Sequence, residues 1–331
     1  MKIAIIKLGA KGDVVRTLPI LIALKEKHPQ SEITWITKKS SEDIVKTSPH
    51  VSKVLKISDN IDEEFDILYN FDIEKEATEL AKKISAKQKF GFCNDCDFVS
   101  TYNLGAEYYL NTLFDDYIKK TNKKTYQEIM FETAELPYKK EHHPIFLTKE
   151  QEKYGEEFLE KNNINAERLI GLHIGSSSRW PSKSWHEENV KDFITKAKQK
   201  GYEILLFGGP EEIEKLKNIV SEMNKLGIKI YNNNPNNSDI EFISLVNQCR
   251  LIVCADSLAL HISLALKKPT LCLFFCTPPA EVEDYEICKK IISPRLYEFF
   301  PEKMDQYSDE LKKSISVDEV IEEVERILKQ K

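Results

Sequence analysis

The stretch Leu251–Phe275, with the sequence LIVCADSLALHISLALKKPTLCLFF, decides the fold of this chain. Its two apolar runs, Leu251–Cys254 and Pro269–Phe275, are typical of strands that are buried on both faces. Between them, a helical segment begins after Asp256 and Ser257. A strand, a helix and a strand in this order predict a right-handed βαβ unit and therefore a parallel sheet.

The polar residues at the start of this helix are expected at a ligand site. Ligands of open parallel sheets bind beyond the carboxyl ends of the strands, where Asp256, Ser257 and His261 would lie. The unpaired N–H groups at the start of the helix, together with the helix dipole, would hold an anion such as a diphosphate. The alternative is that Asp256 or Ser257 only caps the helix.

Length and composition predict a cytoplasmic protein with two domains. A chain of 331 residues, 41% of them hydrophobic, is long enough to build two cores. Its 48 basic and 54 acidic side chains nearly balance, which argues against nucleic acid as a partner. The seven cysteines, an odd number in a chain without an export signal, indicate reduced thiols. No apolar stretch reaches the roughly 18 residues of a spanning helix, so we expect at most peripheral membrane contact.

The first half has the rhythm of a parallel α/β domain. Lys2–Lys7, Glu32–Thr37 and Asp66–Asn70 have the composition of strands. Ser41–Thr47 and Glu74–Ile84 have the apolar spacing of helices. This alternation predicts βαβ units.

The turn after the first strand carries a candidate catalytic carboxylate. We predict a loop over Leu8–Val15, in which Gly9 and Gly12 permit a tight strand-to-helix turn. The third glycine of a dinucleotide-binding fingerprint is missing. Asp13 stands at the entrance of the following helix, where it would either cap the helix or accept a proton from a substrate hydroxyl.

Residues 91–125 interrupt this rhythm and are rich in aromatic residues. Packing in the core is the simpler interpretation of these side chains, and a wall that receives an acceptor is the alternative. Cys93 and Cys96 lack the second ligand pair of a zinc site. The D-x-D match Asp95-Cys96-Asp97 does not follow a clear strand. We therefore expect no bound metal.

The pattern restarts with a strand at Arg168–Ile174, followed by the polar loop Gly175–Trp185. The serines of this loop, with Arg179 and Lys183, offer hydroxyl groups and positive charge to an anion. A plain solvated loop is the alternative interpretation. A further strand over Tyr202–Phe207 also ends in a polar turn.

Two domains with a ligand cleft between them follow from these patterns. The predicted domains are residues 1–148 and 149–331. The amphipathic segment Val317–Leu328 closes the chain as a helix, and its apolar face is a candidate for packing back on the N-terminal domain.

Four ordered motifs carry a resemblance to a known family. They are GDVVRTLP at 12–19, HIG with SRWPSKSW over 173–185, FGG at 207–209 and DSLALH at 256–261. Together they resemble glycosyltransferase family 9, the heptosyltransferases that build the inner core of lipopolysaccharide. The resemblance extends from about residue 1 to about residue 285. It implies an α/β protein of the GT-B fold, in which two Rossmann-like parallel-sheet domains face each other across a cleft.

The resemblance also implies roles for individual residues. Asp13 would be the general base, and the N-terminal domain would bind the acceptor, with Lys11, Gly12 and Arg16 as candidates for acceptor or loop contacts. The C-terminal domain would bind the nucleotide sugar. The implied donor-binding residues are Ser178, Lys183, Gly208, Gly209, Asp256, Ser257, Leu258 and His261.

Two positions depart from the family's pattern. Leu258 stands where the family often has glycine, and Phe275-Cys276-Thr277 replaces a G-P-T turn. The approach of the backbone to a phosphate is therefore expected to differ at these points.

The resemblance implies an inverting glycosyltransferase that needs neither metal nor cofactor. We expect transfer of heptose from ADP-heptose to a hydroxyl of a lipopolysaccharide-core-type or other surface glycan or glycolipid. We further expect a monomer in the cytoplasm, at the cytoplasmic face of the inner membrane. The alternatives are a sugar-nucleotide epimerase of the same scaffold and a non-catalytic nucleotide-sugar-binding protein.

Overall fold

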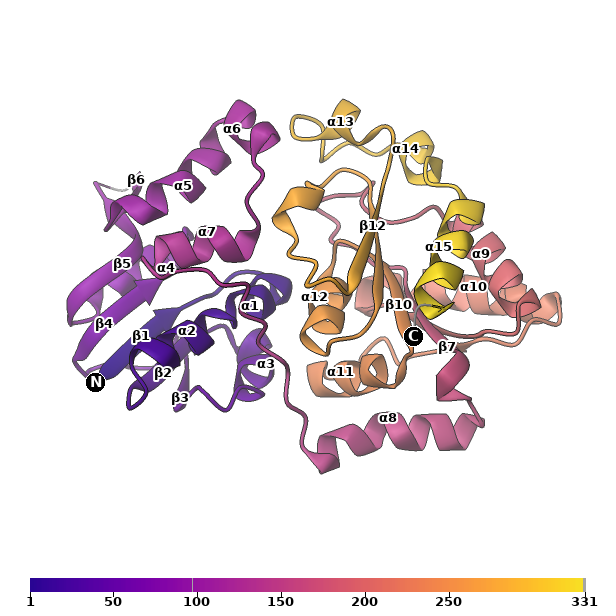
Figure 1. Cartoon of the computed structure of the whole chain (residues 1–331), viewed down its shortest axis with the longest axis horizontal. Helices are drawn as coiled ribbons and strands as arrows, with labels where there is room; N and C mark the ends of the chain where they lie inside the picture. Colours follow the sequence, from indigo (N-terminus) through magenta and orange to yellow (C-terminus); the bar gives the residue numbers. More distant parts are fainter. Residues whose placement is uncertain (97, 330–331) are drawn as a thin grey trace. The chain divides into compact units, whose positions relative to one another are not determined.

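The computed structural model describes residues 1–96 and 98–329, and these form two compact units (Figure 1). Unit 1 comprises Met1–Phe146 together with the short segment Ala280–Glu283. Unit 2 comprises Leu147–Pro279 and the chain from Asp284 onward. The segment 280–283 is tied to unit 1 by a hydrogen bond of 2.8 Å, which the Tyr138 hydroxyl donates to Glu283 Oε2. The sequence patterns did not predict this segment's place in unit 1.

The sheet of unit 1 has the strand order β3-β2-β1-β4-β5-β6. All neighbouring strands are parallel except the pair β5 and β6, which is antiparallel. The three strands predicted for this half are confirmed, and β3, β5 and β6 are additional. The strands are β1 (Lys2–Ile6), β2 (Glu32–Thr37), β3 (Lys53–Lys56), β4 (Phe65–Asn70), β5 (Ala86–Asp95) and β6 (Phe98–Thr101).

The helices of unit 1 lie between these strands and after β6. The predicted loop over Leu8–Val15 is wrong in its second part, because a helix already begins at Lys11. The helices are α1 (Lys11–Thr17), α2 (Ile20–Lys27), α3 (Glu42–Lys46), α4 (Lys75–Lys83), α5 (Glu107–Phe114), α6 (Asp116–Thr121) and α7 (Tyr126–Thr133), with 3-10 turns at Lys39–Ser41 and Leu104–Ala106.

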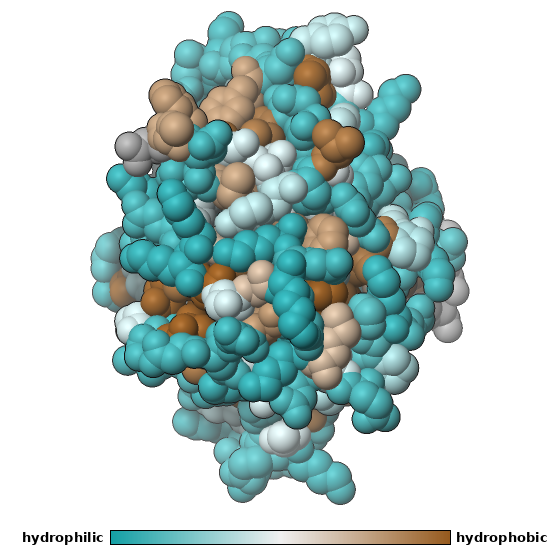
Figure 2. Space-filling model, turned by 90° about the vertical axis from the view of Figure 1, so that its left-hand side faces the viewer, coloured by the Kyte–Doolittle hydropathy of each residue, from teal (hydrophilic) through white to brown (hydrophobic). Residues whose placement is uncertain are grey.

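The aromatic segment 91–125 forms the end of β5, strand β6 and helices α5 and α6. Tyr109 packs against Phe92 and Tyr126 as core packing requires. In contrast, Phe98, Phe114 and Tyr117 are each at least 75% exposed. Figure 2, in which the left-hand side of Figure 1 faces the viewer, shows apolar side chains among hydrophilic ones on that face. Core packing therefore explains only part of the segment, and Asp97 of the D-x-D match lies outside the described residues.

The sheet of unit 2 has the order β12-β11-β10-β7-β8-β9, and every neighbouring pair is parallel. The four strands predicted from the sequence are confirmed as β7, β8, β10 and β11. Counted from the start of this unit, the order is the 3-2-1-4-5-6 of a doubly wound nucleotide-binding sheet. The strands are β7 (Leu169–His173), β8 (Glu203–Phe207), β9 (Tyr231–Asn232), β10 (Leu251–Ala255), β11 (Thr270–Phe274) and β12 (Cys288–Ile292).

The helices of unit 2 cover this sheet, and one core cluster joins the sheet to α9, α10 and α15. Alternate residues of β10, Leu251 and Val253, belong to this cluster, because side chains of a strand alternate between its two faces. The helices are α8 (Lys149–Asn162), α9 (Glu187–Gln199), α10 (Ile213–Lys225), α11 (Asp239–Gln248), α12 (Leu258–Ala265), α13 (Leu296–Phe299), α14 (Asp309–Lys313) and α15 (Val317–Lys329), with 3-10 turns at Ala166–Arg168, Pro210–Glu212 and Pro279–Glu281.

The terminal helix α15 belongs to unit 2. Its buried apolar residues, Val317, Val320, Ile321, Val324 and Ile327, are part of the core cluster of this unit. The placement of this helix on the N-terminal domain is therefore wrong, because its apolar face is already covered within unit 2.

Gly171 in the centre of β7 is a sensitive point of this core. A Cβ atom there would lie 2.5 Å from Ile252 Cδ1 and 2.8 Å from Phe207 Cε2. We expect Gly171→Ala to lower the free energy of unfolding by about 1–3 kcal/mol, because both side chains must leave their packed positions. Urea unfolding followed by circular dichroism measures this change. An unchanged unfolding midpoint would contradict the packing described for this strand.

Candidate functional site

In unit 1 the strand order reverses between β1 and β4, which are adjacent at the centre of the sheet. Crevices for ligands form at such switch points, beyond the carboxyl ends of the strands. The turn after β1 leads into α1, and the turn after β4 brings Asp72 to the same place. The candidate base Asp13 lies in the first turn of α1.

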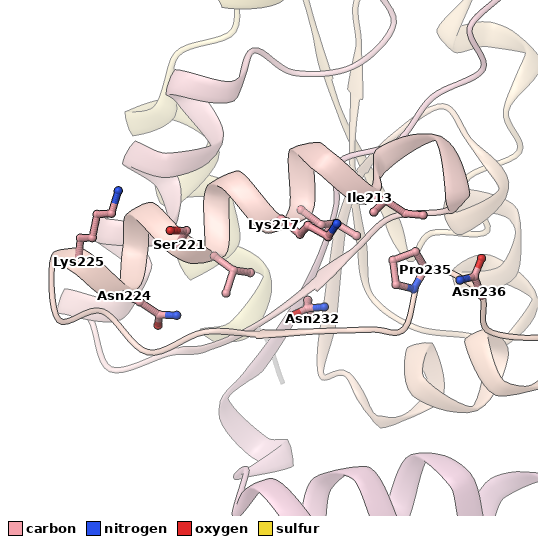
Figure 3. Close-up of a pocket in the computed structure, with 10 residues that line it drawn as sticks. Ile213, Lys217, Ser221, Asn224, Lys225, Asn232, Pro235 and Asn236 are labelled. Atoms are coloured by element: carbon pink, nitrogen blue, oxygen red, sulfur yellow. The ribbon is translucent and has the colours of Figure 1, made fainter.

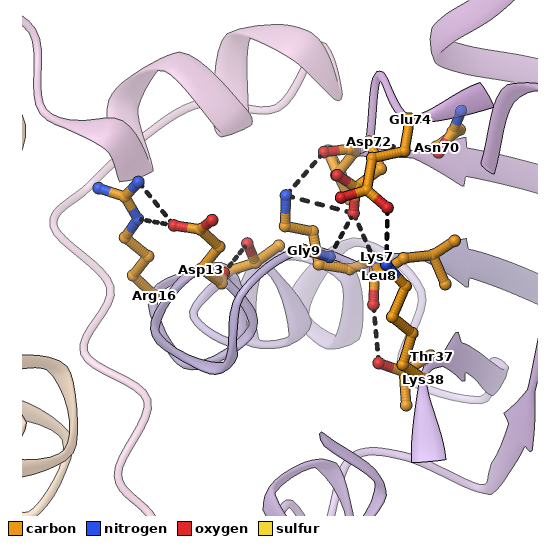
Figure 4. Close-up of polar contacts among 12 residues, drawn as sticks. Lys7, Leu8, Gly9, Asp13, Arg16, Thr37, Lys38, Asn70, Asp72 and Glu74 are labelled. Atoms are coloured by element: carbon orange, nitrogen blue, oxygen red, sulfur yellow. Dashed lines mark hydrogen bonds and ion pairs between the residues drawn. The ribbon is translucent and has the colours of Figure 1, made fainter. Parts of the chain in front are cut away.

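A buried ion pair fixes the turn between β1 and α1 (Figure 4). Lys7 is 3% exposed, donates from Nζ to the Phe71 carbonyl at 3.0 Å and lies 3.5 Å from Asp72 Oδ2. The same carboxylate oxygen accepts the backbone N–H groups of Leu8 and Gly9. Burial opposes the charge of Lys7, but Tyr126, Asp72 and Asp13 outweigh it and raise the pKa of Lys7 above its usual range. A permanent cation therefore lies beneath this turn.

Asp13 does not cap its helix. The N-cap position of α1 belongs to Ala10, so the capping interpretation of Asp13 is wrong. Its side chain is 34% exposed and pairs with Arg16, whose Nη2 and Nε lie 2.7 Å and 3.0 Å from Oδ1. A Cβ atom on Gly9 would lie 3.3 Å from Asp13 Oδ2 and 3.4 Å from Lys7 Nζ. Glycine at position 9 thus leaves the space into which the carboxylate and the amine both point.

The other predicted residues of this turn lie beside Asp13. Lys11 and Gly12 are the first two residues of α1 and are partly exposed. The sequence analysis missed Lys7, Asp72 and Tyr126. A lysine directly after a buried strand was a usable signal for Lys7, and an aspartate two residues after β4 was one for Asp72. No local pattern pointed to Tyr126.

In unit 2 the switch point lies between β7 and β10, and a side-chain hydrogen bond joins the two strand ends. His173 Nδ1 lies 3.3 Å from Ser257 Oγ. Ser257 occupies the N-cap position of α12 but makes no capping hydrogen bond, so the capping interpretation is wrong for this residue. Burial, with a smaller effect of Lys215, lowers the pKa of His173 to about 4, which keeps its imidazole neutral near pH 7.

Three predicted donor-binding residues meet at the same switch point. Lys183 Nζ lies 3.2 Å from Asp256 Oδ2, and His261 Nε2 lies 3.7 Å from Asp256 Oδ1. Lys183 and Asp256 are only 14% and 16% exposed. Burial raises the pKa of the neighbouring Cys276 thiol to about 11, against the opposing effect of Lys183, so this thiol stays neutral. The arrangement presents a cation, a carboxylate and an imidazole to one point.

The turn after β8 is held by side chains of its own unit. The N–H of Gly208 donates to Asn233 Oδ1 at 3.0 Å, and the N–H of Gly209 donates to Glu212 Oε2 at 2.9 Å. The Glu212 carboxylate also lies against Gly175, where a Cβ atom would approach it to 2.9 Å. The predicted residues Gly208 and Gly209 thus lie near Gly175, the first residue of the loop over 175–185. The sequence analysis missed Glu212.

The loop over 175–185 is exposed over residues 177–179 and anchored in its second half. Ser178 is exposed, whereas Ser182 donates to the Gln306 carbonyl at 2.8 Å. The indole N–H of Trp185 donates to the Ile315 carbonyl at 3.1 Å. The loop is therefore more than a plain solvated connection. Leu258, the remaining predicted residue, is the first residue of α12.

A separate cavity of about 750 Å³ lies along α10 (Figure 3). Its lining includes Ile213, Val220 and Pro235, with Lys217 and Lys225 as its charged residues. None of the predicted donor-binding residues lines it. The cavity is therefore distinct from the switch-point site.

No group of three or more His, Cys, Asp and Glu side chains that could hold a metal ion occurs within residues 1–96 and 98–329. Cys93 is buried and Cys96 is exposed. Over the same residues, no helix has the length and apolar character needed to cross a membrane.

The chain resembles known proteins along nearly its whole length. Lipopolysaccharide heptosyltransferase 1 of Campylobacter coli is 25% identical over 301 residues, which are 84% of this chain and 85% of that protein. The glycosyl transferase family 9 structure from Veillonella parvula DSM 2008 has a TM-score of 0.80 at 19% identity, with 100% and 97% of the two chains covered. For E. coli ADP-heptose lipopolysaccharide heptosyltransferase II, the TM-score is 0.70 at 17% identity, with 100% and 99% covered.

These likenesses confirm the predicted fold class and resemblance. The sequence profile of glycosyltransferase family 9 (heptosyltransferase) matches residues 55–309, which is more than half of the chain. The protein therefore belongs to glycosyltransferase family 9 and is a glycosyltransferase of the GT-B fold.

Proposed function

We propose that this glycosyltransferase moves heptose from ADP-heptose to a hydroxyl of a lipopolysaccharide-core-type or other surface glycan, with inversion at the anomeric carbon. The observation that carries the proposal is the cluster of Lys183, Asp256 and His261 at the switch point of unit 2. Its residue types and position suit a nucleotide diphosphate. The names of the similar heptosyltransferases support heptose as the transferred sugar.

The donor diphosphate would bind at the start of α12. The first N–H groups of this helix carry the positive end of its dipole. Lys183 would pass from Asp256 to a phosphate oxygen, and Asp256 would then be available to a hydroxyl of the sugar. Ser178, Ser257 and His261 would add hydrogen bonds, and the turn at Gly208 and Gly209 would border the nucleoside.

Stabilisation of the departing diphosphate would supply most of the rate. As the bond to the sugar breaks, negative charge grows on the diphosphate, and fixed donors at that position lower the barrier. The same cation and helix-start amides would take the place of a metal ion. Because the sugar would be attacked from the face opposite the diphosphate, a single displacement would invert its configuration.

Asp13 would act as the general base. An acceptor hydroxyl loses its proton only as the new bond forms, and a carboxylate next to it lowers the barrier of that step. Its exposed fraction of 34% leaves Asp13 accessible to an acceptor. Lys11 and Gly12 would line the same position.

Incubation with ADP-heptose, with and without a lipid A-type glycan, tests the proposal. We expect ADP and glycosylated product to form together, and only when the glycan is present. Conversion of the nucleotide sugar without the glycan would instead identify an epimerase. Binding without any release of ADP would identify a nucleotide-sugar-binding protein. Product analysis by NMR gives the anomeric configuration.

Metal removal is a separate prediction. We expect excess EDTA to leave the rate of ADP release unchanged, because the proposed phosphate contacts come from Lys183, serine hydroxyls and backbone amides. The measurement compares initial rates before and after chelation, and addition of Mg²⁺ serves as the control. Loss of activity that a divalent cation restores would overturn the metal-independent mechanism.

A further inference from the structure

We propose that Arg16 is a positioning residue for the reaction: stacked on Tyr126, its guanidinium holds the Asp13 carboxylate in the orientation that accepts the proton. This inference rests on the proposed function, in which Asp13 is the base. It gives Arg16 a role different from the acceptor or loop contacts expected from the sequence. It also explains the role of Tyr126, which no motif contains.

The contact between Arg16 and Asp13 is a fork on a single oxygen. Nη2 and Nε lie 2.7 Å and 3.0 Å from Asp13 Oδ1 (Figure 4). The two residues are three positions apart on α1, the spacing at which helix side chains meet. Two donors hold Oδ1 at a defined distance from the guanidinium, and because the helix backbone holds the other end of the side chain, they limit the rotation of the carboxylate. The other oxygen, Oδ2, then points toward the space over Gly9.

Tyr126 in turn fixes the guanidinium. Arg16 Cζ lies 3.7 Å from the centroid of the Tyr126 ring, the distance of a stacked cation. The ring is 1% exposed and packs edge-on against Tyr109, with 6.2 Å between centroids. Tyr126 opens α7, whose start is held by a capping box of Thr125 and Glu128. The platform under Arg16 is therefore rigid, and Arg16 itself is only 16% exposed.

A lysine at position 16 would keep the charge but not this geometry. An ammonium group cannot form a planar fork and does not stack flat on a ring. Positive charge near Asp13 is also supplied by Lys7, which lies below the same turn. Orientation is therefore the property that distinguishes Arg16 from Lys7, and Arg16→Lys removes the fork on Asp13 while keeping the charge.

The experiment measures kcat and the donor KM of Arg16→Lys with ADP-heptose and a lipid A-type glycan. We expect kcat to fall by roughly 10- to 100-fold, because misplacing a reacting group by about 1 Å has effects of this size. The donor KM should stay unchanged, since the proposed donor contacts belong to unit 2. Arg295→Lys is the matched control. Arg295 makes the same fork from Nε and Nη2 to one oxygen of Glu298, at an exposed place in unit 2.

A double-mutant cycle separates positioning from direct contact with substrate. In an Asp13→Asn background, Arg16→Lys should cause no further loss, because the carboxylate that it positions is gone. An equal loss in both backgrounds would overturn the inference. So would an Arg16→Lys enzyme as active as the Arg295→Lys control. If Asp13→Asn retains full activity, the proposed base itself fails, and that result is distinguishable from the other two.

The platform provides an independent readout. Tyr126→Leu should lower kcat as much as Arg16→Lys does. Tyr126→Phe keeps the ring beneath the guanidinium, so its kcat should equal that of the unchanged enzyme. Thermal unfolding of both variants identifies any loss that comes from unfolding. A Tyr126→Leu protein that is folded and fully active would overturn the role of the stacked pair.

Discussion

Asp13→Asn is expected to reduce sugar transfer by roughly 10²- to 10⁴-fold, the contribution typical of a general base. Asparagine has the same size but cannot accept the hydroxyl proton as the bond forms. Binding of ADP should be unchanged, because the proposed donor contacts come from Lys183 and Asp256 in unit 2. Initial rates of ADP release give the first quantity and calorimetry gives the second.

The matched control for this variant is Asp66→Asn. Asp66 is also in unit 1, is 32% exposed and pairs with Lys87 at 2.6 Å, so it resembles Asp13 in exposure and pairing. It lies near the amino end of β4, whereas the candidate site lies beyond the carboxyl ends of the strands. Transfer should be normal in Asp66→Asn. Equal activity of the Asp13 and Asp66 variants would remove the catalytic assignment of Asp13.

Lys183→Ala is expected to weaken ADP binding by roughly 10- to 150-fold, which corresponds to about 1.5–3 kcal/mol for a charged hydrogen bond. The lysine is mostly buried and is held 3.2 Å from Asp256, so it is poised at the switch point before the donor arrives. Titration calorimetry with ADP measures the change. The loss should appear in kcat as well, because charge grows on the diphosphate in the transition state.

Two controls identify the cause of such a loss. Lys198 forms a comparable pair with Glu203 at 2.8 Å and is 21% exposed, but it lies at the end of α9, so Lys198→Ala should bind ADP normally. The second control is Lys183→Ala combined with Asp256→Asn. If Lys183 only neutralises Asp256, the double variant regains ADP affinity. If Lys183 contacts the diphosphate, the affinity stays low.

Much of the fold followed from sequence periodicity. The predicted strands include apolar runs bounded by polar turns, namely β1, β2, β7, β8, β10 and β11. Such runs can be recognised in a sequence because both faces of a parallel strand are buried. The edge strand β9 was missed because it is only two residues long. The hairpin of β5 and β6 was missed because its antiparallel pairing interrupts the βαβ alternation.

The candidate site was predictable only in part. The ends of strands in a parallel sheet can be predicted from the sequence. Asp13, Asp256 and Ser257 follow such ends, and the strand orders show that these ends lie at the switch points. The partners of these residues were not predictable. His173 lies 84 positions before Ser257, with which it forms a hydrogen bond. Tyr126 lies 110 positions after Arg16, which stacks on its ring.

The sequence by itself determined the parallel core of both α/β sheets, the family, and the strand ends at which polar residues collect, because periodicity and motifs can be recognised along the chain without knowledge of its tertiary contacts. Only the tertiary structure decided what those residues contact. It placed Lys7 against Asp72 beneath the turn to α1. It also paired the Asp13 carboxylate with Arg16 instead of with the amides at the start of the helix. Such pairings depend on which segments the sheet order makes adjacent, and no spacing along the chain encodes that adjacency.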